Sequence, residues 1–207
     1  MPHSDNHQVP IARFRASDGT PVAEVDLSNR RVVGVERLIS EARERGADKL
    51  WVHAHVIDAG LGFVRRGSYV RLEARVPPAS IDLAHPPAGL VRKLQRACFG
   101  DVWGRHEPGM ADGDSFFVGL HESGAWVGIC EVDPDRQWID GPGIVPWLRT
   151  PDRYARLVRG AAAYLRDEGV VLETWGDPPS ALEAYAALGF EPVHSVTGWE
   201  LDLRASP

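Results

Sequence analysis

The chain has few cysteines and no long apolar run. Two cysteines among 207 residues, Cys98 and Cys130, are too few for a disulfide framework, so a small disulfide-stabilised fold is excluded. Two buried thiols in a reducing cytoplasm are the simpler interpretation. The apolar runs fall far short of the roughly 20 residues that a membrane-spanning helix needs. The first residues also lack the charged-then-apolar layout of a secretory signal. We therefore expect a cytoplasmic protein without a membrane partner.

An excess of basic residues is also missing. The formal net charge is −6, which argues against nucleic acid as a partner. The charge is uneven, because residues 1–80 carry a balance of +2 and residues 81–207 a balance of −8. The acidic part would attract cations such as amines, and an ordinary solvated acidic surface is the alternative interpretation.

A pattern of helix, short strand, Leu-Gly-Phe and strand pair occurs twice. The C-terminal copy consists of a helix at 156–169, a strand at Val170–Trp175, Leu188–Phe190 and a strand pair that reaches Leu203. The shorter N-terminal copy consists of a helix at 37–46, a strand at 49–53, Leu61–Phe63 and a strand pair that runs to Arg75. Such self-similarity indicates an internal duplication. The Pro-rich residues 77–89 between the copies are the best linker candidate.

Turn residues between apolar segments predict further strands. Hairpins are predicted at 11–27, with Asp18-Gly19 as the turn, and at 115–132. Two longer strand-like segments contain internal breakers. They are a bent strand or hairpin at 64–75 with Gly67-Ser68 at the break, and a strand at 137–148 that Gly141-Pro142-Gly143 interrupts.

Capping residues mark the helix boundaries. Thr150, Pro151 and Asp152 suit the N-cap and the first turn of a long helix, because they satisfy its N–H groups and its dipole. Ser180-Ala-Leu-Glu183 is a capping box for the last helix, which Gly189 ends. Strands alternate with helices only in the second half of the C-terminal part. The sequence therefore predicts an α+β fold with a mixed, mostly antiparallel sheet, one parallel crossover and flanking helices.

The segment from Leu172 to Glu191 carries a resemblance to a known family. It places Asp177, Tyr185 and Gly189-Phe190 at the spacing of a strand-then-helix motif. In this it resembles the GCN5-related N-acetyltransferase (GNAT) superfamily.

The resemblance divides the chain into parts and implies a fold for each. Residues 90–204 resemble a near-complete GNAT-like domain, and residues 10–76 resemble the C-terminal half of a second one, with residues 77–89 as the linker. This arrangement is similar to the tandem, mycothiol synthase-like acetyltransferases. A half-domain cannot cover its own sheet, so we expect it to dock on the larger domain or to pair with another chain as a homodimer.

The resemblance also implies a reaction, acyl transfer from acetyl-CoA or another acyl-CoA to a small-molecule amine. In this family a tyrosine at the position of Tyr185 protonates the departing thiolate, and a strand carboxylate accepts the proton of the amine. We assign that carboxylate to Glu131, because a carboxylate that shares a strand face with apolar groups has a raised pKa. Asp133, Asp140 and Glu173 are alternatives.

The acyl-CoA loop of the family reads Gln/Arg-x-x-Gly-x-Gly/Ala at a helix N-terminus, where backbone N–H groups bind the pyrophosphate. The aligned residues 149–154 contain neither glycine. Arg149 and Arg153 remain the candidate phosphate-binding groups, and the resemblance adds Asp177 to the cofactor site. The missing glycines favour two alternatives. One is a GNAT-derived binding or assembly protein without CoA, and the other is a repurposed fold with different biosynthetic chemistry.

Aromatic residues suggest where a substrate would bind. Trp103, His121 and Trp175, with Glu173, are candidates for a pocket that takes a cationic or planar substrate. His53 and His55 have a spacing that occurs in metal sites, but no third ligand accompanies them and we predict no metal.

Overall fold

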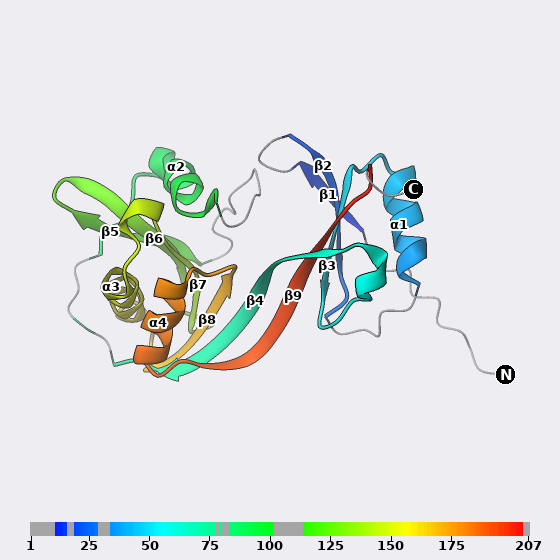
Figure 1. Cartoon of the computed structure of the whole chain (residues 1–207). Helices are drawn as coiled ribbons and strands as arrows, with labels where there is room; N and C mark the ends of the chain where they lie inside the picture. Colours follow the sequence, from blue (N-terminus) through cyan, green and yellow to red (C-terminus); the bar gives the residue numbers. More distant parts are fainter. Residues whose placement is uncertain are drawn as a thin grey trace. The chain divides into compact units, whose positions relative to one another are not determined.

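The structure is a computed structural model that describes residues 11–15, 19–28, 34–77, 79, 83–101 and 114–204. They belong to two compact units, Met1–Arg66 with Val196–Pro207, and Gly67–Ser195. Figure 1 shows the chain coloured along its sequence. The predicted α+β fold with a mixed, mostly antiparallel sheet is confirmed. The partial repeat and its boundaries stay a prediction. Among the described helices, none is long and apolar enough to cross a membrane.

The first unit is built on four strands and one helix. The predicted N-terminal hairpin is confirmed as β1 (Ala12–Arg15) and β2 (Pro21–Asp26). Helix α1 (Val35–Glu44) follows, and β3 (Lys49–Ala54) then pairs with β2 in parallel. On its other side β3 pairs with the end of β9 (Glu191–Asp202) in the antiparallel sense. The core lies between α1 and one face of these strands.

The second unit contains an antiparallel meander followed by a parallel crossover. Its predicted hairpin is confirmed as β5 (Phe116–Glu122) and β6 (Ala125–Asp133), and β7 (Trp138–Ile144) pairs with β6. Helix α3 (Pro151–Ala162) crosses to β8 (Gly169–Trp175), which runs parallel to β7. Strand β4 (Val64–Arg75) pairs with β8, so the strand order is β4–β8–β7–β6–β5.

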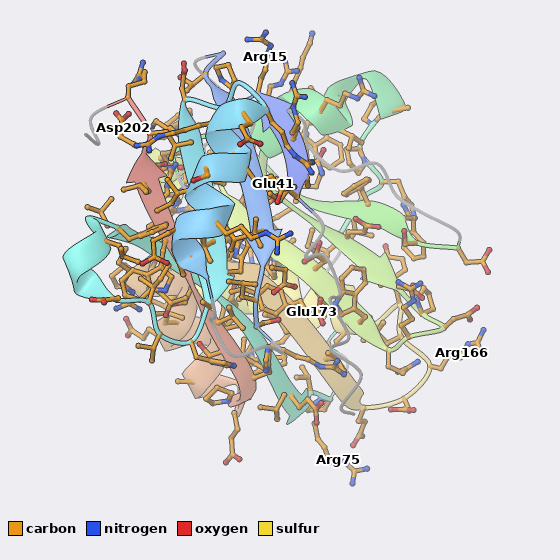
Figure 2. All side chains as sticks on the ribbon, turned by 90° about the vertical axis from the view of Figure 1, so that its right-hand side faces the viewer. Arg15, Glu41, Arg75, Arg166, Glu173 and Asp202 are labelled. Carbon is orange, nitrogen blue, oxygen red and sulfur yellow. The ribbon has the colours of Figure 1, made fainter. Side chains whose placement is uncertain are left out.

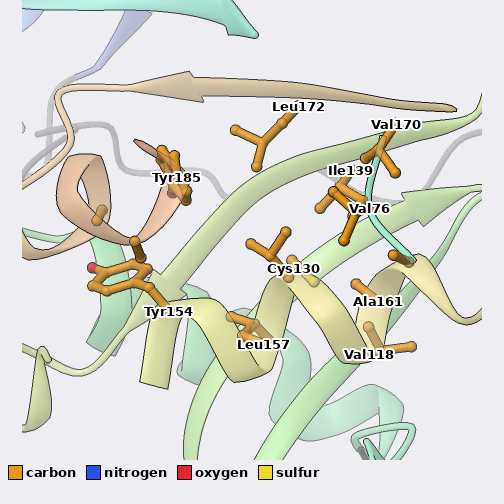
Figure 3. Close-up of a cluster of buried hydrophobic side chains, with 14 of the residues drawn as sticks. Val76, Val118, Cys130, Ile139, Tyr154, Leu157, Ala161, Val170, Leu172 and Tyr185 are labelled. Carbon is orange, nitrogen blue, oxygen red and sulfur yellow. The ribbon is translucent and has the colours of Figure 1, made fainter. Parts of the chain in front are cut away.

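Helices cover both faces of the strands in this second unit. Helices α3 and α4 (Pro179–Ala187) share a core with the strands, in which Val132, Ile139 and Leu172 are fully buried. Figure 3 shows part of this core. Helix α2 (Ala88–Phe99) forms a separate cluster with Ile129 and Val145 on the opposite face. Short 3-10 helices lie at Ala59–Leu61 and Pro146–Leu148.

The start of α3 is as predicted, and its end is not. The Thr150 hydroxyl accepts the backbone N–H of Arg153 at 3.3 Å, and Pro151 occupies the first helical position. The helix ends at Ala162 rather than near Gly169, because the following N–H groups bond to carbonyls three residues back. Tyr164 N–H, for example, bonds to the Ala161 carbonyl at 3.0 Å. Such bonds tighten the last turn and end the helix.

Three other local predictions were wrong. Helix α4 has Pro178 as its N-cap and no side-chain cap, so Ser180 lies inside the helix and the capping box is not formed. Strand β9 is one continuous strand of 12 residues rather than a strand pair. Strand β4 is also continuous over 12 residues, which agrees with the single-strand alternative and not with the hairpin. Gly141-Pro142-Gly143 does not interrupt β7 but places a bulge in it, where the register with β6 shifts.

Close packing of α2 against β7 gives a testable prediction. A Cβ added at Gly143 would lie 2.2 Å from Phe99 Cζ and 3.0 Å from Cys98 Cβ. We expect Gly143→Ala to lower the free energy of unfolding by about 1–3 kcal/mol in a denaturant titration, because the core must move apart. Gly89→Ala is the matched control, since a Cβ there meets nothing within 4 Å. Equal losses in both variants would contradict this packing.

Candidate functional site

The two parallel strands of the second unit share few residues. Strand β7 pairs with β8 only from Trp138↔Val171 to Asp140↔Glu173. Beyond these residues β7 continues along β6 as far as Ile144, and β8 continues along β4 as far as Trp175. We call the place where they separate, after Asp140 and Glu173, the strand parting.

Three carboxylates lie side by side at the strand parting. Glu131 of β6 is opposite Asp140 of β7, and Asp140 is opposite Glu173 of β8. Directly opposed residues have Cβ atoms about 4.5–5.5 Å apart and point to the same face. Because alternate residues face opposite sides, this carboxylate row lies on the face away from Ile139 and the α3–α4 core.

Asp140 holds its proton more tightly than an ordinary aspartate. Burial raises the pKa of Asp140 to about 7, and the neighbouring charges of Glu131 and Glu173 add to the rise. A backbone hydrogen bond from Gly141 opposes it. Asp140 therefore titrates near neutral pH, which is the property required of a group that accepts and releases a proton.

The two outer carboxylates have polar partners. The Ser115 hydroxyl donates to Glu131 at 2.5 Å. Arg71, which is opposite Glu173 on β4, lies 3.9 Å from its carboxylate. The Tyr69 hydroxyl also bonds to Glu173, and burial together with this bond raises the pKa of Tyr69. Glu173 is labelled in Figure 2.

Aromatic side chains flank the row on the same face. Trp138 lies two residues before Asp140 on β7, and its Nε1 is buried without a hydrogen-bond partner in the described structure. Trp175 lies two residues after Glu173 and opposite Tyr69. Sequence reasoning named Trp175 but missed Trp138 and Tyr69. The orphan indole N–H of Trp138 was not visible in the sequence, and Tyr69 comes from a distant strand.

The start of α3 decides whether acyl-CoA fits. Thr150 already caps the N–H of Arg153, Pro151 has no N–H, and Asp152 places a negative charge in the first turn. Phosphate oxygens at a helix N-terminus need open N–H groups and a positive field. These residues supply neither, so they do not fit the pyrophosphate of the cofactor that the family resemblance implies.

The two candidate phosphate-binding arginines are engaged elsewhere in the chain. Arg149 makes two bonds to Asp101, at 2.6 and 2.7 Å, and donates to the carbonyls of Cys98 and Ile144. Arg153 pairs with Glu122 at 2.9 Å. Arg149 and Arg153 as cofactor ligands stay predictions, and in this structure they bind α2 and β5 instead.

Tyr185 and Asp177 lie together, on the other face from the carboxylate row. Tyr185 is 1 % exposed, and its hydroxyl bonds to Asp177 Oδ1 at 3.2 Å. Thr174 donates to the same oxygen at 2.6 Å, while the buried Asp177 Oδ2 has no hydrogen-bond partner among the described residues. Burial raises the pKa of Asp177 to about 6, and burial raises that of Tyr185 well above its usual range. The role of Tyr185 as an acid stays a prediction.

The remaining predicted residues within the described ranges do not lie at the carboxylate row. Trp103 lies outside the described residues. His121 is near the other end of β5, where its ring packs on Trp126. Asp133, the last residue of β6, accepts two backbone N–H bonds from the turn that follows. His53 Nε2 pairs with Glu24 at 2.7 Å. Within the described ranges, no group of three or more potential ligands is arranged to hold a metal ion.

Solved structures with a similar fold were found. A GCN5-related N-acetyltransferase from Sphaerobacter thermophilus matches over 95 % of this chain and 77 % of its own, with 13 % identity and a TM-score of 0.55. One from Kribbella flavida matches over 92 % and 89 %, with 14 % identity and a TM-score of 0.54. The chain has the GNAT fold. A conserved Staphylococcus epidermidis protein of unknown function matches over 96 % and 93 %, with 12 % identity and a TM-score of 0.57.

Comparison by sequence adds nothing to this fold assignment. No protein-family profile matches the chain. No curated protein matches it either. The structural identities are too low to carry an activity across, so the function has to be argued from the site itself.

The raised pKa of Asp140 predicts a pH-dependent stability. Its folded pKa of about 7 exceeds the unfolded value, so the folded state holds the extra proton. Stability from this group is therefore present at low pH and is lost as pH rises toward 7. We expect Asp140→Asn to raise the melting temperature by several degrees at pH 8 and by much less at pH 4.5.

Asp101 supplies a control of opposite sign. Its hydrogen bond from Arg149 lowers the pKa of this carboxyl. Asp101→Asn should therefore lower the melting temperature at pH 8, with a smaller loss in acid. A gain at pH 8 from both variants would point to a general effect of acidic charge rather than to the burial of Asp140.

Proposed function

We propose that this chain is a GNAT-fold protein that binds a small protonated amine at the carboxylate row and does not use acyl-CoA at α3. The observation that carries the proposal is the position of Asp140. It is half-buried between two further carboxylates at the place where β7 and β8 separate. Like charges at adjacent strand positions destabilise a sheet, and a bound cation relieves this cost.

The surroundings favour an organic ammonium group as that cation. Tyr69, Trp138 and Trp175 share the face of the row, and aromatic faces attract ammonium groups. The buried Nε1 of Trp138 offers a hydrogen bond to an acceptor atom on the same ligand. A small amine that carries a hydroxyl or carbonyl group would satisfy both the carboxylates and this indole.

N-acyl transfer to the bound amine is the second candidate function. A primary ammonium must lose a proton before its nitrogen can attack an acyl carbon, and Asp140, with a pKa of about 7, is suited to hold that proton. Glu131 would then assist Asp140 through its charge rather than act as the base. The GNAT fold supports acyl transfer in general, and direct transfer in a ternary complex is the form that the resemblance implies.

Binding of the amine can be tested with a panel of primary amines, diamines and an amino sugar, each beside its matching alcohol. We expect calorimetry to detect amine binding that strengthens between pH 5.5 and pH 8, because Asp140 ionises over this range. Asp140→Asn should weaken binding at least about tenfold and remove the pH dependence. Glu73→Gln is the matched control, since Glu73 is an exposed β4 carboxylate outside the row.

The same panel distinguishes the two functions. Binding without acyl transfer from acetyl-CoA supports the amine-binding protein, and thiol release that requires both the amine and Asp140 supports the transferase. Equal heats for amines and alcohols, or equal losses in the Asp140 and Glu73 variants, would contradict both.

A further inference from the structure

The space beyond the strand parting is filled from the α3 face by Tyr154. This side chain is only 1 % exposed although it belongs to the first turn of α3. Its ring meets the ring of Tyr185 edge-on, with centroids 6.3 Å apart and planes at 85°. Figure 3 shows the two tyrosines next to each other, one on α3 and one on α4.

The hydroxyl of Tyr154 lies near the backbone at the end of β7. Val145 donates its N–H to Val127 of β6 at 3.0 Å. Because successive N–H groups of a strand point to opposite sides, the N–H of Ile144 is directed away from β6. The Ile144 N–H lowers the pKa of Tyr154, against the larger effect of burial, and this places the N–H near the phenol oxygen. The phenol of Tyr154 thus lies beside an edge of β7 that β8 does not reach.

Residues that follow β8 hold Tyr154 in this position. Tyr185 is fixed by its bond to Asp177, which directly follows β8 and also accepts the Thr174 hydroxyl. Tyr154 therefore lies between the end of β7 and the turn that follows β8. Burial raises the pKa of Tyr154 to about 12, so its phenol stays protonated at neutral pH.

We infer that Tyr154 closes the strand parting to any extended acyl-donor arm, so that unit Gly67–Ser195 does not bind acyl-CoA along β7. A long amide-bearing ligand enters such a site by bonding to the free edge of a strand. Here Tyr154, which is almost fully buried, lies beside that edge, and its ring packs against the buried ring of Tyr185. This goes beyond the amine proposal, because it concerns a different face of the sheet and a different ligand.

The size of residue 154 is decisive in this arrangement. In the family pattern the aligned position is glycine or alanine, which would leave the space of the ring open. The capped start of α3 excludes the phosphates, and Tyr154 excludes the arm attached to them. The capped helix start and Tyr154 thus both act against acyl-CoA, and the second effect depends on a single side chain.

The test compares the wild type with Tyr154→Ala and Tyr154→Phe, using pantetheine and CoA as probes. We expect calorimetry to detect neither probe at millimolar concentration with the wild type or with Tyr154→Phe, whose ring still fills the space. Tyr154→Ala should bind pantetheine. Binding of CoA to the wild type as tightly as to Tyr154→Ala would overturn the inference.

Amide hydrogen exchange keeps the test decisive if Tyr154→Ala does not fold. Tyr154→Phe removes only the hydroxyl, so the Ile144 amide should exchange at least about tenfold faster than in the wild type. Unchanged Ile144 exchange in Tyr154→Phe, or slower Ile144 exchange in the wild type on addition of CoA, would also overturn the inference. Amine binding is measured on Tyr154→Phe in parallel. If the wild type does not bind amines, that result contradicts the amine proposal alone.

Discussion

The candidate site depends on how short the pairing between β7 and β8 is. Two parallel strands that share only three register pairs must separate while each remains bound to its outer neighbour. On one face, the last shared positions bring Asp140 and Glu173 together. At the edge of β7 beyond Asp140, the same separation leaves backbone groups without a pairing strand among the described residues. The carboxylates thus lie on one face of the sheet, and the Tyr154 side chain lies beside the unpaired edge of β7.

The alternation of residues along the strands places apolar and charged pairs on opposite faces of the sheet. Ile139 and Leu172 are opposite each other and fully buried, and the next pair, Asp140 and Glu173, faces the other way. The apolar pair stabilises the sheet by excluding water beneath α3 and α4. That burial offsets the repulsion among the carboxylates on the reverse face. The sheet tolerates these neighbouring carboxylates because the adjacent apolar pair is well packed.

Much of the fold could be predicted because its signals are local. The β1–β2 hairpin, the Thr150 cap and the β5–β6 hairpin each depend on a few neighbouring residues, and each prediction was confirmed, although Asp18 of the predicted turn lies outside the described residues. The errors arose where neighbours overrode the local signal. Gly67-Ser68 remains in β4, where the Ser68 carbonyl accepts the Gly176 N–H at 2.9 Å. Pro178 starts α4 ahead of the predicted capping box because it is already extended as the N-cap.

The site was predictable in part, for the same reason. Glu131, Asp140 and Glu173 were named as candidate carboxylates, but their contact depends on strand register, which the sequence did not provide. Tyr69 and Arg71 join Glu173 from a strand about 100 positions away in the chain, where no spacing rule applies. The bulk of Tyr154 was visible in the sequence. Its position beside Ile144 was not, because it requires the three-dimensional course of β7.

The division of the chain at Arg66 and Val196 has a consequence for how the protein can be dissected. The first unit is discontinuous in sequence, since its strand β3 pairs with residues at the end of β9. The second unit is one uninterrupted segment, Gly67–Ser195, inserted between those two pieces. A gene fragment that stops at the Pro-rich residues would thus encode a sheet without the partner strand of β3. The inserted segment is the only one of the two that a single deletion could remove as a whole.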